Sequence, residues 1–180
     1  MQIFPANPRE IAASLWRNRS LIKTSIKREV LGRYRGSFLG ILWSFFNPLF
    51  MLVVYTFVFS IIFKARWNVG SESKTEFALA LFAGMIVFNL FAECIGRAPG
   101  LIVGNQNYVK KVVYPLEILP WVGLGAALFH CAISLGVWLI AYLIFFGVPH
   151  ATLLYFPLVL LPFGLFIMGL SWAPVSYTHL

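Results

Sequence analysis

From Phe38 to Phe63 the chain carries no charged residue, and no other feature of the sequence limits its fold as strongly. A helix of this length rises about 39 Å, which exceeds the roughly 30 Å hydrocarbon core of a bilayer. The composition agrees, because 60% of the residues are hydrophobic and 11% are charged, against roughly 45–50% and 25% in soluble domains. We therefore predict an all-α integral membrane protein.

Three further apolar runs complete the predicted transmembrane domain, residues 38–173. The sequence predicts four spans and one polar loop, at about residues 38–63, 77–95, 118–146 and 151–172 for the spans and 96–117 for the loop. Asn47-Pro48 interrupts the first run, and we expect a kink there because proline cannot donate a backbone hydrogen bond. Residues 147–150 are expected to form a tight turn.

The residues before the first span, 1–37, form a basic amphipathic segment. Helix-start signals at Asn7-Pro8 and at Ser20 predict two helices. Eight of the 14 basic residues lie in this segment, and bordering an apolar span they favour contact with anionic membrane lipids over nucleic acid. An ordinary helix packed on a partner is the alternative. The distribution of Lys and Arg places the N-terminus in the cytoplasm.

Several kinds of chemistry are absent from the sequence. There is no Asp and no phosphate-binding loop of the GxxxxGK[ST] type, so we expect no catalytic residue, no metal and no cofactor on this chain. Cys94 and Cys131 are expected to be small buried side chains. His130 is interpreted as a packed or helix-bridging residue. Glu93, with Arg97 four residues later, predicts a local ion pair, with a proton relay as the less favoured alternative.

Two sets of residues near the first two spans allow two interpretations each. Glycines spaced by four residues indicate either close helix packing or loops and hinges; they are Gly32, Gly36 and Gly40, and Gly96, Gly100 and Gly104. Trp43 and Tyr55 in the first span are either interface anchors and core residues, or aromatic faces that stack on sugars.

Two motifs resemble those of ABC-2 type polysaccharide exporter permeases. The first covers residues 28–48 and is similar to the start of that family's first span, with the core Arg33-Tyr34-Arg35-Gly36-Ser37 running on through Leu42-Trp43 into Asn47-Pro48. The second covers residues 110–120 and resembles the family's cytoplasmic segment after the second span. Leu116 departs from this pattern, because the family more often carries Arg there.

The resemblance implies a permease subunit with six spans, so this chain would lack the last two. It implies a permease dimer with separate subunits that bind and hydrolyse ATP, and export of lipid-linked O-antigen, capsule or teichoic-acid chains through the bacterial inner membrane. The implied substrate-gate residues are Arg33, Tyr34 and Arg35. Trp43 and Tyr55 are further gate candidates if their aromatic faces stack on sugars. The implied ATPase-coupling residues are Tyr108, Lys110, Lys111, Val112, Tyr114, Pro115 and Glu117.

Two other functions remain open at this point. One is an ABC-2 permease for a drug or small lipid, and the other is a membrane-embedded enzyme that acts on a lipid-linked substrate. The basic residues of the gate would also suit simple positive-inside anchoring, which needs only charge. Residues 174–180 resemble one reading frame of a sequencing-library transposon adaptor, so we expect them to be a non-native tail.

Overall fold

The computed structural model describes residues 8–62, 74–100 and 118–177. These residues are helical apart from short turns. The elements in chain order are α1 (Pro8–Arg17), α2 (Arg19–Arg33), η1 (Gly40–Leu42), α3 (Trp43–Tyr55), η2 (Thr56–Ile62), α4 (Lys74–Arg97), η3 (Ala98–Gly100), α6 (Leu119–Phe146), η6 (Ala151–Tyr155) and α7 (Phe156–Tyr177). The all-α prediction is confirmed over these parts of the chain.

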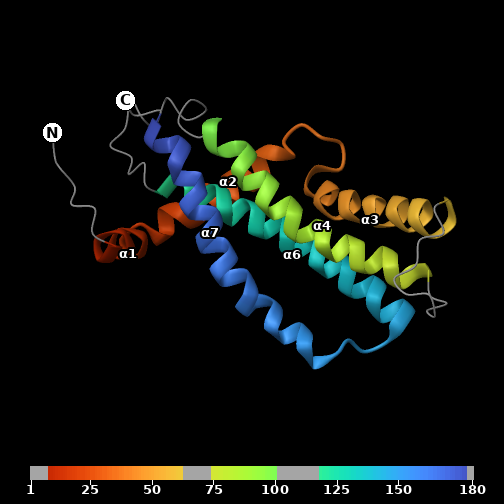
Figure 1. Cartoon of the computed structure of the whole chain (residues 1–180). Coiled ribbons are helices and arrows are strands. Elements are labelled where there is room, and N and C mark those ends of the chain that lie inside the picture. Colours follow the sequence, from red (N-terminus) through yellow and green to blue (C-terminus); the bar gives the residue numbers. More distant parts are fainter. Residues whose placement is uncertain (1–7, 63–73, 101–117, 178–180) are drawn as a thin grey trace.

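The helices contain four segments that are long and apolar enough to cross a membrane. They are Gly40–Phe59, Thr75–Gly100, Leu119–Phe146 and Ala151–Trp172. Figure 1 shows them running back and forth, so that the end of α4, the start of α6 and the end of α7 lie near the N-terminal helices. We call this side of the bundle the basic end, and the opposite side, where α6 turns into α7, the far end.

The core of the bundle is the contact between α4 and α6. A stripe of buried side chains at helical spacing follows each helix: Leu79, Phe82, Ile86, Leu90 and Cys94 on α4, and Leu124, Ala127, Cys131, Val137 and Ala141 on α6. The small residues on α6 allow the two backbones to approach closely. The indole N–H of Trp138 also donates a hydrogen bond of 2.9 Å to the carbonyl of Leu79. Both cysteines are free and buried, as predicted.

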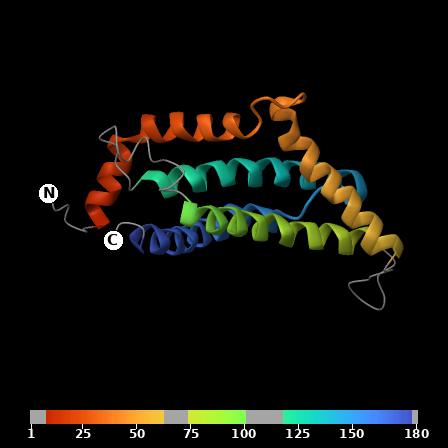
Figure 2. The same ribbon diagram turned by 90° about the horizontal axis from the view of Figure 1, so that it is seen from above.

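Helix α2 packs along the first half of α6 (Figure 2), whereas α1 turns across the basic end. The contact depends on Gly125, because a Cβ atom there would lie 2.3 Å from Cδ1 of Ile26. Ser25 and Val30 are buried on the same helix. Lys23 and Lys27 are exposed, so their side of α2 is the surface on which we expect anionic lipids. Placement of the N-terminal helices in the membrane interface stays a prediction.

The first span begins later than expected. The chain turns between α2 and α3 at Gly36 and Gly40, which have φ values of 86° and 52°. L-residues with a side chain rarely adopt such angles. Gly36 and Gly40 therefore serve the turn, and a Cβ atom at either would meet nothing within 4 Å. Gly32 lies within α2, where the close-packing interpretation stays a prediction. Helix α3 continues through Pro48, and the kink expected at Asn47-Pro48 stays a prediction.

Candidate functional site

A cavity of about 790 Å³ lies where the end of α2 meets α3, α4 and α6. Its lining combines ionisable, polar and aromatic side chains from segments far apart in the sequence. The residues are Arg33, Tyr34, Ser37, Trp43, Ser44, Asn47, Pro48, Met51, Tyr55, Phe82, Met85, Ile86, Asn89, Ala92, Glu93, His130 and Ser134. Because α3 and α4 run in opposite directions, these residues form layers from the basic end to the far end.

The layer nearest the basic end is an ion-pair cluster between α2 and α4. Arg33 donates a short hydrogen bond to Oε1 of Glu93. Arg97 lies 3.8 Å from the same carboxylate oxygen and 3.1 Å from Oε1 of Glu29. The predicted local pair between Glu93 and Arg97 is therefore present, but it belongs to a larger network. Two arginines and two glutamates alternate in it, and their formal charges cancel.

Tyr34 and His130 connect α2 to α6 beside this cluster. The Tyr34 hydroxyl lies 3.3 Å from Nδ1 of His130, and the two rings meet edge to face with centroids 5.9 Å apart. Burial raises the pKa of the Tyr34 phenol, the charge of Arg33 opposes this, and Glu93 adds to it. The phenol therefore stays protonated at neutral pH. Nε2 of His130 is buried and has no hydrogen-bond partner among the described residues. The helix-bridging interpretation of His130 is confirmed.

Neutral polar side chains form the middle layer. Asn47 comes from α3, Asn89 from α4 and Ser134 from α6, and all three line the cavity. The Ser44 hydroxyl donates a 2.7 Å hydrogen bond to the carbonyl of Ile41. Pro48 has no N–H to donate to the carbonyl of Ser44, so a further acceptor is available on this side of α3. Amides within apolar spans are costly in lipid, so their position in a shared cavity indicates a polar occupant.

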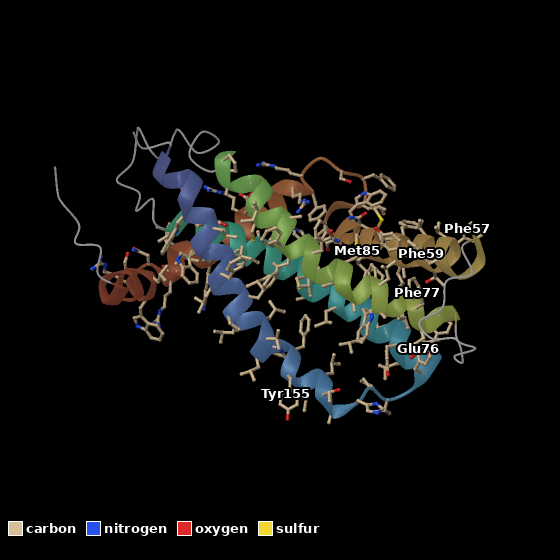
Figure 3. The ribbon with its side chains drawn as sticks, viewed as in Figure 1. Phe57, Phe59, Glu76, Phe77, Met85 and Tyr155 are labelled. Carbon is tan, nitrogen blue, oxygen red and sulfur yellow. The ribbon has the colours of Figure 1, made fainter. Side chains whose placement is uncertain are left out.

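Aromatic and thioether groups close the far end. Tyr55 lies 6.4 Å from Phe82 and 6.2 Å from Phe59 between ring centroids. Phe59 in turn lies 5.9 Å from Phe77 between ring centroids, and both side chains are labelled in Figure 3. Met85 lines the same part of the cavity from α4. Aromatic faces at this depth offer stacking surfaces to a flat, partly apolar ring.

The predicted gate residues are not all placed alike. Arg33, Tyr34, Trp43 and Tyr55 line the cavity, whereas Arg35 does not, although it follows Tyr34 directly. The Arg35 side chain is exposed on the turn after α2. The predicted coupling residues lie outside the described residues: Tyr108, Lys110, Lys111, Val112, Tyr114, Pro115 and Glu117.

Several residues that line the cavity were not predicted from the sequence. Glu93 was assigned only a local pair, and the polar residues of the spans were given no role. A signal for them exists, because Asn89 and Glu93 are four residues apart on α4, as are His130 and Ser134 on α6. Helical residues at this spacing share a face. Polar residues recurring at helical spacing within apolar spans therefore mark the cavity wall.

The cavity has the chemistry of a binding site for an amphiphilic anion. Guanidinium and phenol groups bind phosphate oxygens. Amides and hydroxyls form hydrogen bonds with sugar hydroxyls, and aromatic faces pack on the apolar side of a sugar ring. Among the described residues there is no group of three or more His, Cys, Asp or Glu residues that could hold a metal ion. The arrangement is that of a passage or binding cavity within a membrane domain.

Comparison with known proteins gives a consistent family. The model of the ABC-2 type transporter family matches residues 20–179. The O-antigen export system permease protein RfbA of Myxococcus xanthus is 26% identical over 162 residues, which are 90% of this chain and 60% of that protein. RfbA of Klebsiella pneumoniae is 24% identical over 153 residues, 84% of this chain and 56% of that protein. The chain thus spans less than two thirds of either relative. Since the family model covers most of its length, the chain belongs to the ABC-2 type transporter family.

Proposed function

We propose that the chain is the transmembrane subunit of an ATP-driven exporter that moves lipid-linked polysaccharide across the bacterial inner membrane. The observation that carries this proposal is the layered cavity, with ion pairs at the basic end, amides in the middle and aromatic rings at the far end. The names of the two RfbA relatives support an O-antigen-type cargo. Capsule and teichoic-acid chains share the same chemistry, a phosphate-containing headgroup joined to sugars.

Each layer has a part of this cargo to bind. The phosphate groups fit Arg33 and Tyr34, because a guanidinium binds two phosphate oxygens at once. The first sugar fits Asn47 and Asn89, whose amides offer both donors and acceptors. Tyr55 then offers a ring face for stacking. A glycan, with many hydroxyls, can use both amides as well as the serine hydroxyl, so the lining favours a glycan over a small apolar lipid.

We assign ATP hydrolysis to a separate partner subunit, because the chain belongs to the ABC-2 type transporter family. We place the N-terminus and the loop 96–117 in the cytoplasm on the distribution of Lys and Arg. The loop, with Tyr108 and Val112 as its apolar contacts, would dock on the ATPase. Association of two permease chains completes the proposed exporter.

The glycan assignment is tested by exchanging Asn89 for Leu in the full-length permease. Export of O-antigen in a permease-deficient strain should fall at least tenfold, since a buried sugar hydroxyl would lose its partner. Phe88→Leu is the control, because Phe88 directly precedes Asn89 on α4, is 59% exposed and is not among the residues that line the cavity. If Asn89→Leu exports as much as the Phe88→Leu control, the cavity is not part of the transport path.

The docking assignment has its own test. Exchanging Tyr108 and Val112 for Asp, with Lys110 and Lys111 unchanged, preserves the basic residues that set orientation. Docking predicts normal insertion, no co-purification of the ATPase and no export. Retained co-purification together with retained export would show that the loop only sets topology.

A further inference from the structure

The ion-pair cluster contains a group that competes with the proposed cargo. Arg33 is the cavity's cation for phosphate, but the Glu93 carboxylate already occupies its guanidinium. Glu93 is only 17% exposed, whereas Arg33 is 45% exposed. A ligand anion can therefore approach Arg33 from the open side, and it must displace a carboxylate held on α4.

A carboxylate fixed to the same protein has an advantage over a free anion. It meets Arg33 at an effective concentration that is on the order of millimolar or higher, without loss of translational freedom. A phosphodiester with a single negative charge gains no more Coulomb energy at Arg33 than the carboxylate does. A pyrophosphate diester carries two charges and more acceptor oxygens, so it can bind the guanidinium and the neighbouring Tyr34 hydroxyl together.

The displaced carboxylate would not be left unpaired. Arg97 lies one helical turn after Glu93 on α4 and is already 3.8 Å from it. Arg97 also contacts Glu29 at 3.1 Å, on the same helix as Arg33. Transfer of Glu93 from Arg33 to Arg97 therefore needs only a change of its side-chain conformation. The hydrogen bond between Tyr34 and His130 and the packing of Ile26 on Gly125 still hold α2 in place.

We propose that Glu93 is a built-in competitor for anions at Arg33, which restricts the cavity to ligands with more than one negative charge. This inference rests on the proposed function, and it adds a selection rule to it. The bilayer presents ordinary phosphodiester lipids in vast excess over any lipid-linked glycan. With Glu93 in place, Arg33 rejects those lipids and accepts a pyrophosphate headgroup.

The test compares Glu93→Gln with Glu29→Gln in the full-length permease purified in detergent. Both exchanges add one unit of positive charge, but only the first removes the competitor from Arg33. Binding of labelled inorganic pyrophosphate should become about tenfold tighter in Glu93→Gln, the ratio expected when one charge-assisted hydrogen bond no longer opposes binding. Glu29→Gln should tighten binding by clearly less, because the Glu93 carboxylate remains on α4 and only Arg97 is released from Glu29.

A one-charge competitor tests the selection rule itself. Dimethyl phosphate, a phosphodiester, should fail to displace pyrophosphate from the wild type and should displace it from Glu93→Gln. Unchanged pyrophosphate affinity in Glu93→Gln would overturn the inference. So would an equal gain in Glu29→Gln, since the effect would then be one of net charge.

A second pair of variants keeps the test valid if Glu93→Gln folds poorly. Arg97→Gln removes the guanidinium donor that pairs with the displaced carboxylate, so pyrophosphate should bind more weakly than in Lys27→Gln, which has the same change in charge on the exposed side of α2. Equal binding by these two variants would contradict the transfer of Glu93 to Arg97.

Arg33→Gln separates failure of the inference from failure of the proposed site. If Arg33→Gln loses pyrophosphate binding and Glu93→Gln has no effect, the competitor role of Glu93 is wrong. The proposed headgroup site at Arg33 is then still supported. Full binding by Arg33→Gln would overturn both.

Discussion

Helix α3 lies between two hollows that share the same neighbour, α6, and differ completely in chemistry. The cavity described above has a volume of about 790 Å³ and is lined by charged, amide and aromatic groups. The second hollow has a volume of about 430 Å³ and is almost entirely apolar. We call it the apolar groove; its residues are Phe45, Leu49, Leu52, Val53, Thr56, Phe57, Val137, Ile140, Ala141, Ile144 and Phe145.

The difference teaches how to recognise function on a membrane helix. Any surface that faces lipid or another apolar span must be apolar. An apolar groove between two spans therefore does not by itself indicate a function. Polar groups cost free energy in the same setting and remain only where they have partners or an occupant. Asn47, Asn89 and Ser134 therefore support the proposal that the cavity is the cargo-binding side of α3, which we call its working side.

The largest effect expected from this comparison is on α6, where Ser134 and Val137 are three residues apart but face different hollows. Val137→Asp puts a carboxylate into the apolar core at a cost of about 2.5–3.5 kcal/mol. The yield of folded permease, measured by fluorescence-detected gel filtration, should fall more than tenfold. Ser134→Asp should retain most of the wild-type yield, because its carboxylate enters the polar cavity. Equal losses in both would show that the two hollows do not differ as environments.

Much of the fold could be predicted from the sequence, because apolar runs and their length are direct consequences of the bilayer's thickness. All four predicted spans were found, including the third, predicted at 118–146 and observed as α6, Leu119–Phe146. The start of the first span was placed too early, since hydropathy does not register the positive φ angles at Gly36 and Gly40. Hydropathy also gave no sign that α2 packs against α6.

The site was only partly predictable, for a different reason. Arg33, Tyr34 and Trp43 belong to one continuous motif, so a resemblance was enough to suggest them, and Tyr55 was suggested as an aromatic residue of the first span. Their partners are distant in the sequence: Glu93 is 60 residues from Arg33, and His130 is 96 residues from Tyr34. No local pattern encodes such pairings, which appear only when α2 and α4 pack on α6.

The next effect in size tests the packing that brings α2 to the cavity. Gly125→Leu would place a side chain where Ile26 now lies, at a cost of about 1–3 kcal/mol for overpacking. The apparent melting temperature in detergent should fall, and pyrophosphate binding should weaken because Arg33 and Tyr34 move with α2. The double variant Gly125→Leu with Ile26→Ala should recover part of both. Additive losses in the double variant would mean that the two residues do not interact.

A smaller effect is expected from Tyr34→Phe, which removes the hydrogen bond to His130 and keeps the ring contact. The expected loss is about 0.5–1.5 kcal/mol. Because the folded state raises the pKa of Tyr34, the stabilisation is fully present below the ordinary tyrosine pKa of about 10 and is lost as the pH rises through the raised value. Melting scans at pH 8 to 11 should therefore show an alkaline decline that is shallower in Tyr34→Phe. Identical profiles for the wild type and Tyr34→Phe would mean that other ionisable groups cause the alkaline loss of stability.

The smallest expected effect concerns the apolar groove and sharpens the comparison from its other side. Ile144 lines the groove and is 73% exposed, so Ile144→Ala removes contacts that lipid chains replace, and stability should change by no more than about 0.5 kcal/mol. Export should also stay within a factor of two of the wild type, since Thr56 is the groove's one polar side chain among the residues named above and Ile144 offers no polar group to cargo. Met51→Ala, on the cavity side of α3, makes a truncation of similar size and should lower export further than Ile144→Ala does. A stronger export defect in Ile144→Ala would mean that the groove also takes part in transport, as a seat for the cargo's lipid chain or for a further span, and that polarity alone does not identify the working side of α3.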